Sequence, residues 1–289
     1  VMLVEESALA SRLREKRVEI ITGIAQQAAL AIQNDLLKQE MAEREQLERE
    51  LQLAHEIQQT FMPDQVPRLN GWELAFTWRA ARQVAGDFYD FFELPGGRLG
   101  LVIADVADKG MPAALFMALT RALLRAAALE DESPSDVLAR VNELLLPDAQ
   151  HGMFVTVVYA VLSLETGELA YSVAGHNLPL LWRFRTQQVE QFNSGGLALG
   201  VLEEIDFEDG VACLEAGDQV IFYTDGITEA FSSENKAFGE ERLQMTIRAN
   251  GDGSAQVMLE AIVDSVAAFV GDQLPSDDIT LMVLRRQVI

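Results

Sequence analysis

Four short acidic motifs, each placed where an apolar or β-branched run ends, constrain the fold of this chain more than any other feature. They are Gly86-Asp87-Phe88-Tyr89-Asp90, Asp105-Val106-Ala107-Asp108-Lys109-Gly110, Tyr223-Thr224-Asp225-Gly226-Ile227-Thr228-Glu229 and Asp277-Asp278-Ile279-Thr280. A fold that brings several strand ends together would gather these carboxylates, which repel one another unless cations lie between them. Magnesium and manganese prefer such all-oxygen sites, and two bridged ions suit phosphate-ester hydrolysis. The motifs therefore predict a metal site.

Each motif has a simpler interpretation when it is taken alone. Asp225-Gly226 is typical of a turn, Asp277-Asp278 suits a solvated strand entry, and Gly86-Asp87 suits a β-bulge. Asp105 is equally compatible with an ordinary strand end. What favours the metal site is the conjunction of four acid-bearing strand ends in one domain, two of them followed by small residues that let backbone approach an ion.

Composition narrows the class of protein. The chain has 289 residues, of which 49% are hydrophobic, so it can bury a core and hold one large domain plus an appendage. A formal charge of −23 argues against nucleic-acid binding, because phosphate backbones are held by basic surfaces. The single cysteine, Cys213, lies in an apolar context, which predicts core packing in a reducing compartment. No apolar stretch approaches the roughly 18 to 20 residues of a membrane span and no signal peptide is recognisable, so a cytoplasmic location is expected.

The chain divides into a helical leader over 1–62, a connector over 63–71 and a main domain over 72–289. Before Pro63 the leader has no proline and a single glycine, Gly23, and it is rich in helix-forming residues. Its apolar positions with alternating three/four spacing are Leu30, Leu37, Leu47, Leu51, Ala54 and Phe61, and its polar interruptions are Gln33, Glu40, Arg44 and Gln58. A helical pattern well beyond about 25 residues predicts a coiled coil, and hence a homodimer. A long helix packed along its own domain is the alternative.

The main domain alternates groups of strands with pairs of helices. Strands are expected over 74–78, 99–106, 154–164, 169–174, 179–184, 211–214, 220–223 and 279–284. Helices are expected over 113–130, 135–146, 239–249 and 254–270. Short links between strands indicate hairpins, and this grouping predicts an α+β fold in which two antiparallel sheets lie between helix layers.

Six motifs stand in a fixed order along the chain. They are Val84-Ala85-Gly86-Asp87-Phe88-Tyr89-Asp90, Asp105-Val106-Ala107-Asp108-Lys109-Gly110-Met111-Pro112-Ala113-Ala114, Ala174-Gly175-His176-Asn177, Gly196-Leu197-Ala198-Leu199-Gly200, Thr224-Asp225-Gly226-Ile227-Thr228-Glu229 and Asp277-Asp278-Ile279-Thr280. This ordered set resembles that of the metal-dependent PPM serine/threonine phosphatases, and more closely that of the bacterial SpoIIE/RsbU branch. The similarity extends from about Ala54 to the C-terminus. Residues 21–36 also resemble the exit helix of a GAF sensor domain whose body is missing, which suggests a fragment of a longer sensor protein.

The resemblance implies an αββα sandwich, in agreement with the alternation of helix pairs and hairpins. It also implies two divalent ions, manganese or magnesium, which activate a water for attack on phosphorus. In the family pattern Asp105 bridges both ions, Asp87 binds one of them, and the backbone carbonyl of Val106 is a further ligand. Asp225 and Asp277 match the acids on the other ion. The four aspartates are therefore the expected catalytic residues.

Several positions depart from the family pattern. Eukaryotic relatives have a histidine, a proposed proton donor to the leaving oxygen, where this chain has Ala107; His176 is either a substitute for it or a structural hydrogen-bonding residue. Many relatives of this branch have Ser-Gly where this chain has Ala107 and Asp108, and a glycine where it has Ala85. Asp278 stands where relatives often have asparagine, so it is expected to support the site rather than bind an ion.

The function implied by the resemblance is hydrolysis of phosphoserine or phosphothreonine on a regulatory protein, typically a STAS-domain anti-sigma factor antagonist. A haloacid-dehalogenase-type phosphatase would need Asp-x-Asp after a strand, whereas Asp105 and Asp108 are three positions apart. The remaining alternative is a catalytically inactive phosphatase-like module that serves as a dimeric signalling scaffold, although all the expected metal acids are present. The sequence identifies neither the phosphoprotein, nor the upstream signal, nor the ion used in the cell.

Overall fold

The computed structural model describes residues 2–63, 65–67, 69–81, 84–130, 133–149, 152–193, 195–273 and 277–288, with side chains from residue 16 onward apart from 21 and 25. The chain forms two compact units, Val1–Gln52 and Leu53–Ile289. Helix α1 (Met2–Phe61) makes up the first unit, and its last turns belong to the second.

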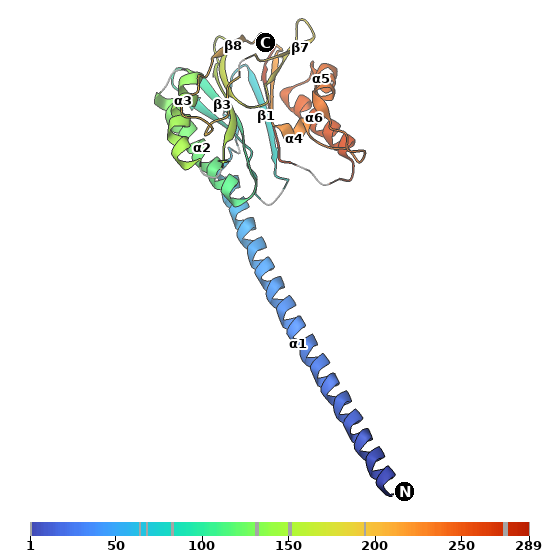
Figure 1. Cartoon of the computed structure of the whole chain (residues 1–289). Helices are drawn as coiled ribbons and strands as arrows, with labels where there is room; N and C mark the ends of the chain where they lie inside the picture. Colours follow the sequence, from blue (N-terminus) through green and yellow to red (C-terminus); the bar gives the residue numbers. More distant parts are fainter. Residues whose placement is uncertain are drawn as a thin grey trace. The chain divides into compact units, whose positions relative to one another are not determined.

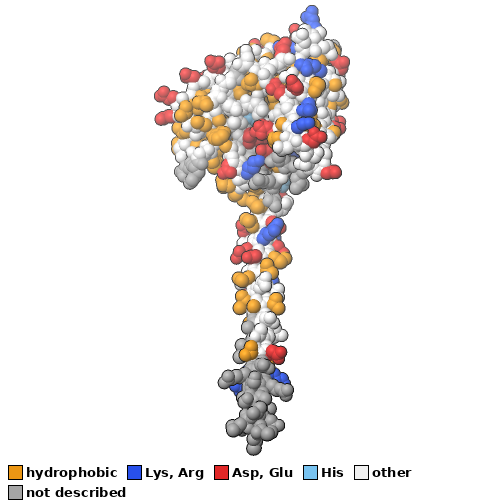
Figure 2. Space-filling view, turned by 45° about the vertical axis from the view of Figure 1, so that its right-hand side comes forward, with side chains coloured by type: hydrophobic (Ala, Val, Ile, Leu, Met, Phe, Trp, Pro, Cys, Tyr) orange, Lys and Arg blue, Asp and Glu red, His pale blue; other side chains and the backbone are white. Residues whose placement is uncertain are grey.

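Within the first unit, most of the described large apolar side chains of α1 face solvent. Val18, Leu30 and Met41 are between 60% and 62% exposed, and Figure 2 shows apolar and charged side chains interspersed along the helix. Exposed pairs such as Arg44 with Glu48, 3.0 Å apart, contribute only a few tenths of a kcal/mol. Because long helices in water depend mainly on packing of an apolar face, this exposed face is compatible with the expected coiled coil, which stays a prediction.

The second unit consists of two five-stranded antiparallel sheets between helices (Figure 1). The first sheet has the order β1 (Trp72–Arg79), β10 (Ile279–Arg286), β9 (Gln219–Tyr223), β6 (Leu180–Arg183) and β7 (Gln188–Gln191). The second has the order β2 (Phe88–Leu94), β3 (Arg98–Val106), β4 (Val155–Ser163), β5 (Glu168–Ala174) and β8 (Gly210–Cys213). Helices α5 (Gly239–Asn250) and α6 (Ala255–Val270) cover the first sheet, and α2 (Met111–Glu130) and α3 (Pro134–Leu145), followed by the 3₁₀ turn Leu146–Asp148, cover the second. The expected αββα sandwich is confirmed.

The central strands are apolar on both faces because each sheet lies between the other sheet and a helix layer. In β9, Val220 and Phe222 belong to the core between the sheets, whereas Ile221 and Tyr223 belong to the core beneath α5 and α6. All four side chains are at most 2% exposed. Burial on both faces explains why this strand is a continuous apolar run in the sequence rather than an alternating one.

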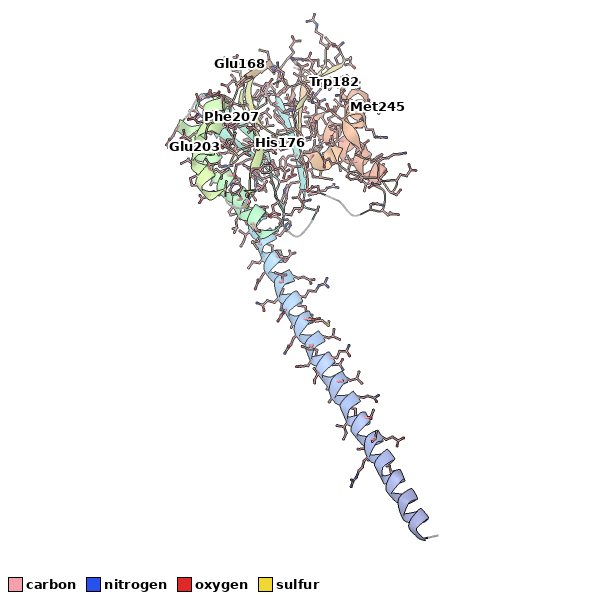
Figure 3. The ribbon with its side chains drawn as sticks, in the orientation of Figure 1. Glu168, His176, Trp182, Glu203, Phe207 and Met245 are labelled. Carbon is pink, nitrogen blue, oxygen red and sulfur yellow. The ribbon has the colours of Figure 1, made fainter. Side chains whose placement is uncertain are left out.

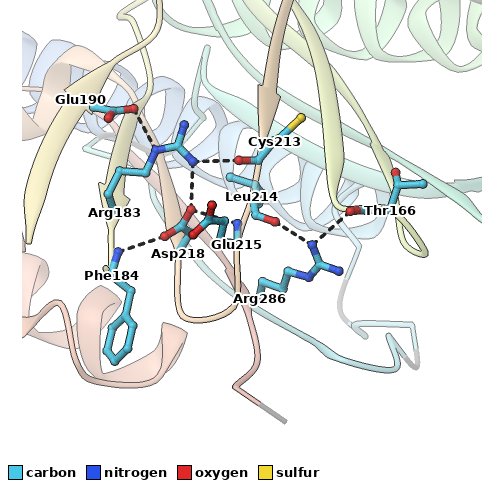
Figure 4. A network of polar contacts seen from close by, with 9 residues as sticks. All are labelled: Thr166, Arg183, Phe184, Glu190, Cys213, Leu214, Glu215, Asp218 and Arg286. Atoms are coloured by element: carbon cyan, nitrogen blue, oxygen red, sulfur yellow. Dashed lines mark hydrogen bonds and ion pairs between the residues drawn. The ribbon is translucent and has the colours of Figure 1, made fainter. Parts of the chain in front are cut away.

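A polar network joins the edge strands at the end of the sheets remote from the acidic motifs (Figure 4). Arg183 on β6 donates to Glu190 Oε2 on β7 at 2.8 Å, to the carbonyl of Cys213 on β8 at 2.7 Å and to Asp218 Oδ2 at 2.9 Å. Arg286 donates to two further backbone carbonyls close by. One guanidinium therefore connects the edge strands of both sheets.

The structure contains elements that the sequence pattern did not indicate, namely β2, β7 and the short helix α4 (Asp225–Thr228). Strand β2 carries Asp90, which is 1% exposed and breaks the apolar run. Its carboxylate is paired with Arg125 at 2.6 Å and with Arg121 at 3.0 Å, both on α2. A buried acid matched by arginines from another element has no local signal in the sequence, which is why the strand was missed.

Two expectations from composition were wrong. Cys213 is exposed rather than packed in the core, because β8 is the edge strand of its sheet. The second expectation was that no apolar stretch approaches the length of a membrane span, yet the described part of the chain contains one helix, α2, that is long and apolar enough to cross a membrane. Its side chains Ala113, Phe116 and Met117 are at most 4% exposed and pack in the core that includes the second sheet. This burial is that of a core helix in a globular domain.

Candidate metal centre

The predicted acids gather because the strand ends that carry them lie at one end of the two sheets. In the first sheet the last residue of β1 pairs with the first of β10, and the last residue of β9 pairs with the third of β10. Asp225, just after β9, and Asp277, just before β10, are therefore neighbours. In the second sheet the first residue of β2 pairs with Ala104 on β3, so Asp87 precedes β2 beside Asp105 near the end of β3.

Asp87 joins the two sheets. Its side chain is buried, and its Oδ2 accepts hydrogen bonds from Thr224 Oγ1 at 2.7 Å and from Thr280 Oγ1 at 2.9 Å, both on the first sheet's side of the site. Burial, followed by the charges of Asp105 and Asp278, raises the pKa of Asp87 well above its ordinary value, and the bond from Thr224 opposes the shift. The two hydroxyls fix the direction of this carboxyl group.

Asp105 lies next to Asp87 and is hydrogen-bonded to it. Burial raises the pKa of Asp105 to about 7, the bond with Asp87 lowers it, and the charges of Asp225, Asp277 and Asp278 add to the rise. Two carboxyl groups in this relation share a proton when no cation separates them. The pair therefore holds less negative charge at neutral pH than two free aspartates would.

The other acids of the site are Asp225 and Asp277, which are predicted metal ligands, and Asp278, which is predicted to support them. Asp277 Oδ1 accepts from Lys109 Nζ at 2.8 Å and from the backbone N–H of Asp278 at 3.0 Å. Asp278 accepts from the backbone N–H groups of Ala81 at 2.8 Å and Gly86 at 2.9 Å, so it holds the loop between β1 and β2. Burial, then the charge of Asp277, raises the pKa of Asp225. Both carboxylate oxygens of Asp278 are engaged by backbone, which fits a supporting role.

Close backbone approaches complete the site. A Cβ on Gly86 would lie 2.8 Å from the carbonyl oxygen of Val106, the predicted backbone ligand, so only glycine fits there. Asp108 has a φ of 80°, a conformation that glycine adopts freely and that aspartate tolerates better than most residues. This conformation is compatible with the glycine that the family resemblance places at that position. Ala85 is not among the described residues with positive φ, so its replacement of a glycine carries no strain.

His176 lies beside the site but is tied into the fold. Figure 3 shows it beyond the end of β5, whose start is marked by Glu168. Its Nδ1 lies 2.7 Å from Thr156 Oγ1, and Thr156 pairs with Asp105 across β3 and β4. Burial lowers the pKa of His176 to about 4 and outweighs the opposing effect of the Tyr223 backbone. Among the described residues, Nε2 has no well-formed hydrogen-bond partner. A neutral imidazole in this position supports the end of β3.

The donor set is all oxygen, as hard divalent cations require. Among the described residues, no group of three or more His, Cys, Asp or Glu side chains is already arranged to hold an ion, so side chains would have to adjust on binding. The positive charge beside the acids is supplied by Lys109, and the raised pKa values of Asp87 and Asp105 favour a proton on that pair. The chemistry of the site therefore fits divalent cations that replace both.

Sequence reasoning missed several residues that serve the site. Thr224 directly precedes Asp225 and Thr280 follows Asp278 by two residues, and that proximity in the motifs was the available signal. Lys109 lies inside the Asp105 motif, but the motif alone did not indicate its contact with Asp277. Gln58 was interpreted as a polar interruption of a coiled-coil seam. It is instead 3% exposed and bonds both the N–H and the carbonyl of Ala85, at 3.1 Å and 2.8 Å.

Comparisons with known proteins identify the family to which the chain belongs. The family described as Stage II sporulation protein E (SpoIIE) matches residues 95–287. The phosphoserine phosphatase RsbU of Bacillus subtilis is 30% identical over 245 residues, covering 85% of this chain and 72% of RsbU. Protein IcfG of Synechocystis sp. is 32% identical over 265 residues, covering 82% of this chain and 41% of IcfG. The chain thus spans less than half the length of IcfG.

Solved structures share the fold. The SiaA-PP2C domain of Pseudomonas aeruginosa has a TM-score of 0.74 at 22% identity, covering 84% of this chain and 98% of that domain. RsbX in complex with magnesium has a TM-score of 0.57 at 16% identity, covering 76% of this chain and 98% of RsbX. The fold and the related sequences together define the class of metal-dependent PP2C-type serine/threonine phosphatases, which are hydrolases. Within that class, the chain belongs to the SpoIIE family.

Proposed function

We propose that the chain hydrolyses phosphoserine or phosphothreonine on a regulatory protein, at a site of two divalent ions. The observation that carries the proposal is the convergence of Asp87, Asp105, Asp225 and Asp277 from two sheets, with Asp105 raised in pKa to about 7 by burial and by its acidic neighbours. Such a concentration of one buried and three half-buried acids is costly unless cations bind. Membership of the SpoIIE family supports the same reaction class.

Manganese or magnesium are the proposed ions, and when bound they supply an activated water and neutralise charge on the phosphoryl group. Asp105 and the Val106 carbonyl would hold them together with Asp87 on the second sheet, and Asp225 and Asp277 would hold them from the first. The chain's own contribution is positioning. The threonine hydroxyls orient Asp87, and the glycine at 86 leaves the Val106 carbonyl accessible.

Protonation of the leaving oxygen is not assigned to His176. Its pKa of about 4 leaves it without a proton to give at neutral pH, and its Nδ1 is engaged with Thr156. We assign His176 the positioning of the β3 end, through Thr156, next to Asp105.

The proposed substrate is a phosphorylated STAS-type anti-sigma factor antagonist. The support is similarity to the phosphoserine phosphatase RsbU over 85% of this chain. A catalytically inactive scaffold would not need the metal acids, yet all of them are retained and gathered. Hydrolysis by the purified chain distinguishes the two functions.

The test compares three substitutions in one assay. Asp105→Asn should lower kcat by more than the roughly 10- to 100-fold that loss of an outer partner of a metal site costs, because this carboxylate would hold both ions. Asp278→Asn should cost less, and Asp108→Asn, an exposed neighbour, should be nearly neutral. Hydrolysis of an aryl phosphate and of a phosphoserine peptide is measured at saturating manganese, with circular dichroism as a folding check. Equal, mild effects of all three substitutions would contradict the assignment.

A further inference from the structure

An apolar pocket of about 220 Å³ opens beside the acidic centre, between the end of β1, α4 and α6. Most of its lining is aliphatic or aromatic, including Ile227, Phe231, Val263 and Val266. Nothing in the proposed chemistry of phosphate hydrolysis uses these side chains. A cavity of about 150 Å³ with apolar walls holds a benzene ring, so this pocket has room for one leucine or phenylalanine side chain.

The pocket shares its wall with the acidic centre. Asp277 and Gly226 line it, and Gly226 directly follows Asp225. A Cβ on Gly226 would overlap the carbonyl oxygen of Asp278, so the backbone of α4 is packed against the loop that carries the acids. A ligand in the pocket is therefore a neighbour of whatever lies at the acids.

The pocket has a buried apolar floor and a solvent-exposed entrance. Ile227 and Val266 are at most 3% exposed, whereas Phe231 is 40% exposed and Ala267 also faces solvent. An exposed aromatic ring beside a buried aliphatic floor favours the entry of an apolar group from outside, because each methylene buried is worth about 0.8 kcal/mol. Arg79 adds a positive charge to the lining, which suits a ligand attached to an anion.

We propose that this pocket binds an apolar side chain of the phosphoprotein substrate, about one to three residues from the phosphorylated residue. Each residue of an extended chain spans about 3.3–3.6 Å, so a phosphoryl group at the acids places such a neighbour within reach of the shared Asp277 wall. The occupant is assigned to the substrate because the wall is common to both sites. This inference rests on the proposed function, and it adds a determinant of substrate selection.

The experiment uses the full chain and short phosphoserine peptides with glycine and serine flanks, in which one flanking position at a time carries leucine. In the wild type, leucine at the preferred position should raise kcat/KM about tenfold over the parent peptide. Ala267→Phe, which fills the pocket mouth from α6, should reduce that ratio to near one and leave kcat/KM for the parent peptide unchanged.

Ala268→Phe is the matched control, because Ala268 is the next residue of the same helix, is exposed and does not line the pocket. It should keep the preference for leucine. No preference at any position in the wild type, or a preference that survives Ala267→Phe, overturns the inference while hydrolysis of the parent peptide upholds the proposed function. A change of oligomeric state in Ala267→Phe with unchanged peptide preference assigns the pocket to a second copy and also overturns it. Failure to hydrolyse any phosphopeptide overturns both.

Discussion

At the scale of single residues, the carboxylates of the acidic centre repel one another, and the fold alone does not offset this repulsion fully. Asp87 and Asp105 come from the ends of neighbouring strands, and the charge of Asp225 raises the pKa of Asp105 further. A proton on the Asp87 and Asp105 pair, which their raised pKa values favour, and the ammonium of Lys109 offset part of this charge. Both can be exchanged for metal ions, so protons and metal compete for the same carboxylates.

The first consequence is a pH-dependent stability of the metal-free protein. The pKa of Asp105 is about 7 in the fold against 3.8 for the unperturbed group, so the folded state retains a proton that the unfolded chain releases. This stabilisation is complete below about pH 4 and is lost as the pH rises through 7. Chelator-treated protein should therefore melt lower at about pH 7.5 than at about pH 5.5, and manganese should reverse the loss.

Asp105→Asn isolates this effect. Without the titrating carboxyl, the metal-free variant should melt at or above the wild type near pH 7.5 and gain less from manganese. His176 has the opposite dependence, because its pKa of about 4 disfavours the fold as the pH falls below 6.5, but it is common to both proteins and cancels in their difference. Asp108→Asn serves as the control. Parallel melting curves for all proteins across this pH range would contradict the account.

At the scale of elements, the last turns of α1 belong to the phosphatase unit. Gln58 holds both backbone groups of Ala85, and Ala85 precedes the Gly86-Asp87 segment. His55 stacks on Trp78, with ring centroids 5.6 Å apart, and Trp78 donates to the Asp87 carbonyl at 3.0 Å. The end of the helix is thus connected to a predicted metal ligand by two short routes.

Gln58→Ala tests the importance of this contact. Removing the side chain leaves a buried N–H and a buried carbonyl without partners, which should lower the free energy of unfolding by about 1–3 kcal/mol. It should also raise the manganese concentration needed for half-maximal activity, because the loop that carries Asp87 loses its anchor. Gln59→Ala, one residue on, removes an exposed side chain whose bond to His55 Nε2 is at the surface and leaves the Ala85 contact intact, so it should change stability by no more than about 0.5 kcal/mol. Urea denaturation and metal titration of both variants measure these effects; equal behaviour would remove the anchor role.

Elements with a local signal could be predicted from the sequence, and those that depend on distant partners could not. Strand β3 and helix α6 have apolar patterns and end signals of their own, and both were expected within a few residues of their bounds. Strand β2 was not, because Asp90 becomes acceptable only through Arg121 and Arg125 on α2. In the sequence Gln58 looks like a polar interruption of the coiled-coil seam for the same reason, since its partner, Ala85, lies 27 residues away. The acids themselves were predictable because their motifs mark strand ends.

At the scale of the whole molecule, most of the described large apolar side chains of the first unit are exposed. In α1, Leu37 is 49% exposed and Leu47 is 56% exposed, and the alternating spacing places both on the expected seam. Polar residues at Glu40 and Arg44 interrupt that seam and would weaken it. A weak helix pair is able to change register or angle.

The structure therefore predicts that the chain is a dimer that α1 holds together. Replacing Leu37 and Leu47 by glutamine should make it monomeric, because each buried leucine contributes about 1.5–3 kcal/mol to such an interface. Replacing Leu36 and Met41 by glutamine is the matched control, since both are exposed on the same helix but lie off the seam. Light scattering measures the mass of each variant, and hydrolysis assays at the same concentrations show whether monomers differ in activity. A monomeric wild type, or equal masses for the two double variants, would leave a phosphatase with a helical leader and no coiled-coil switch.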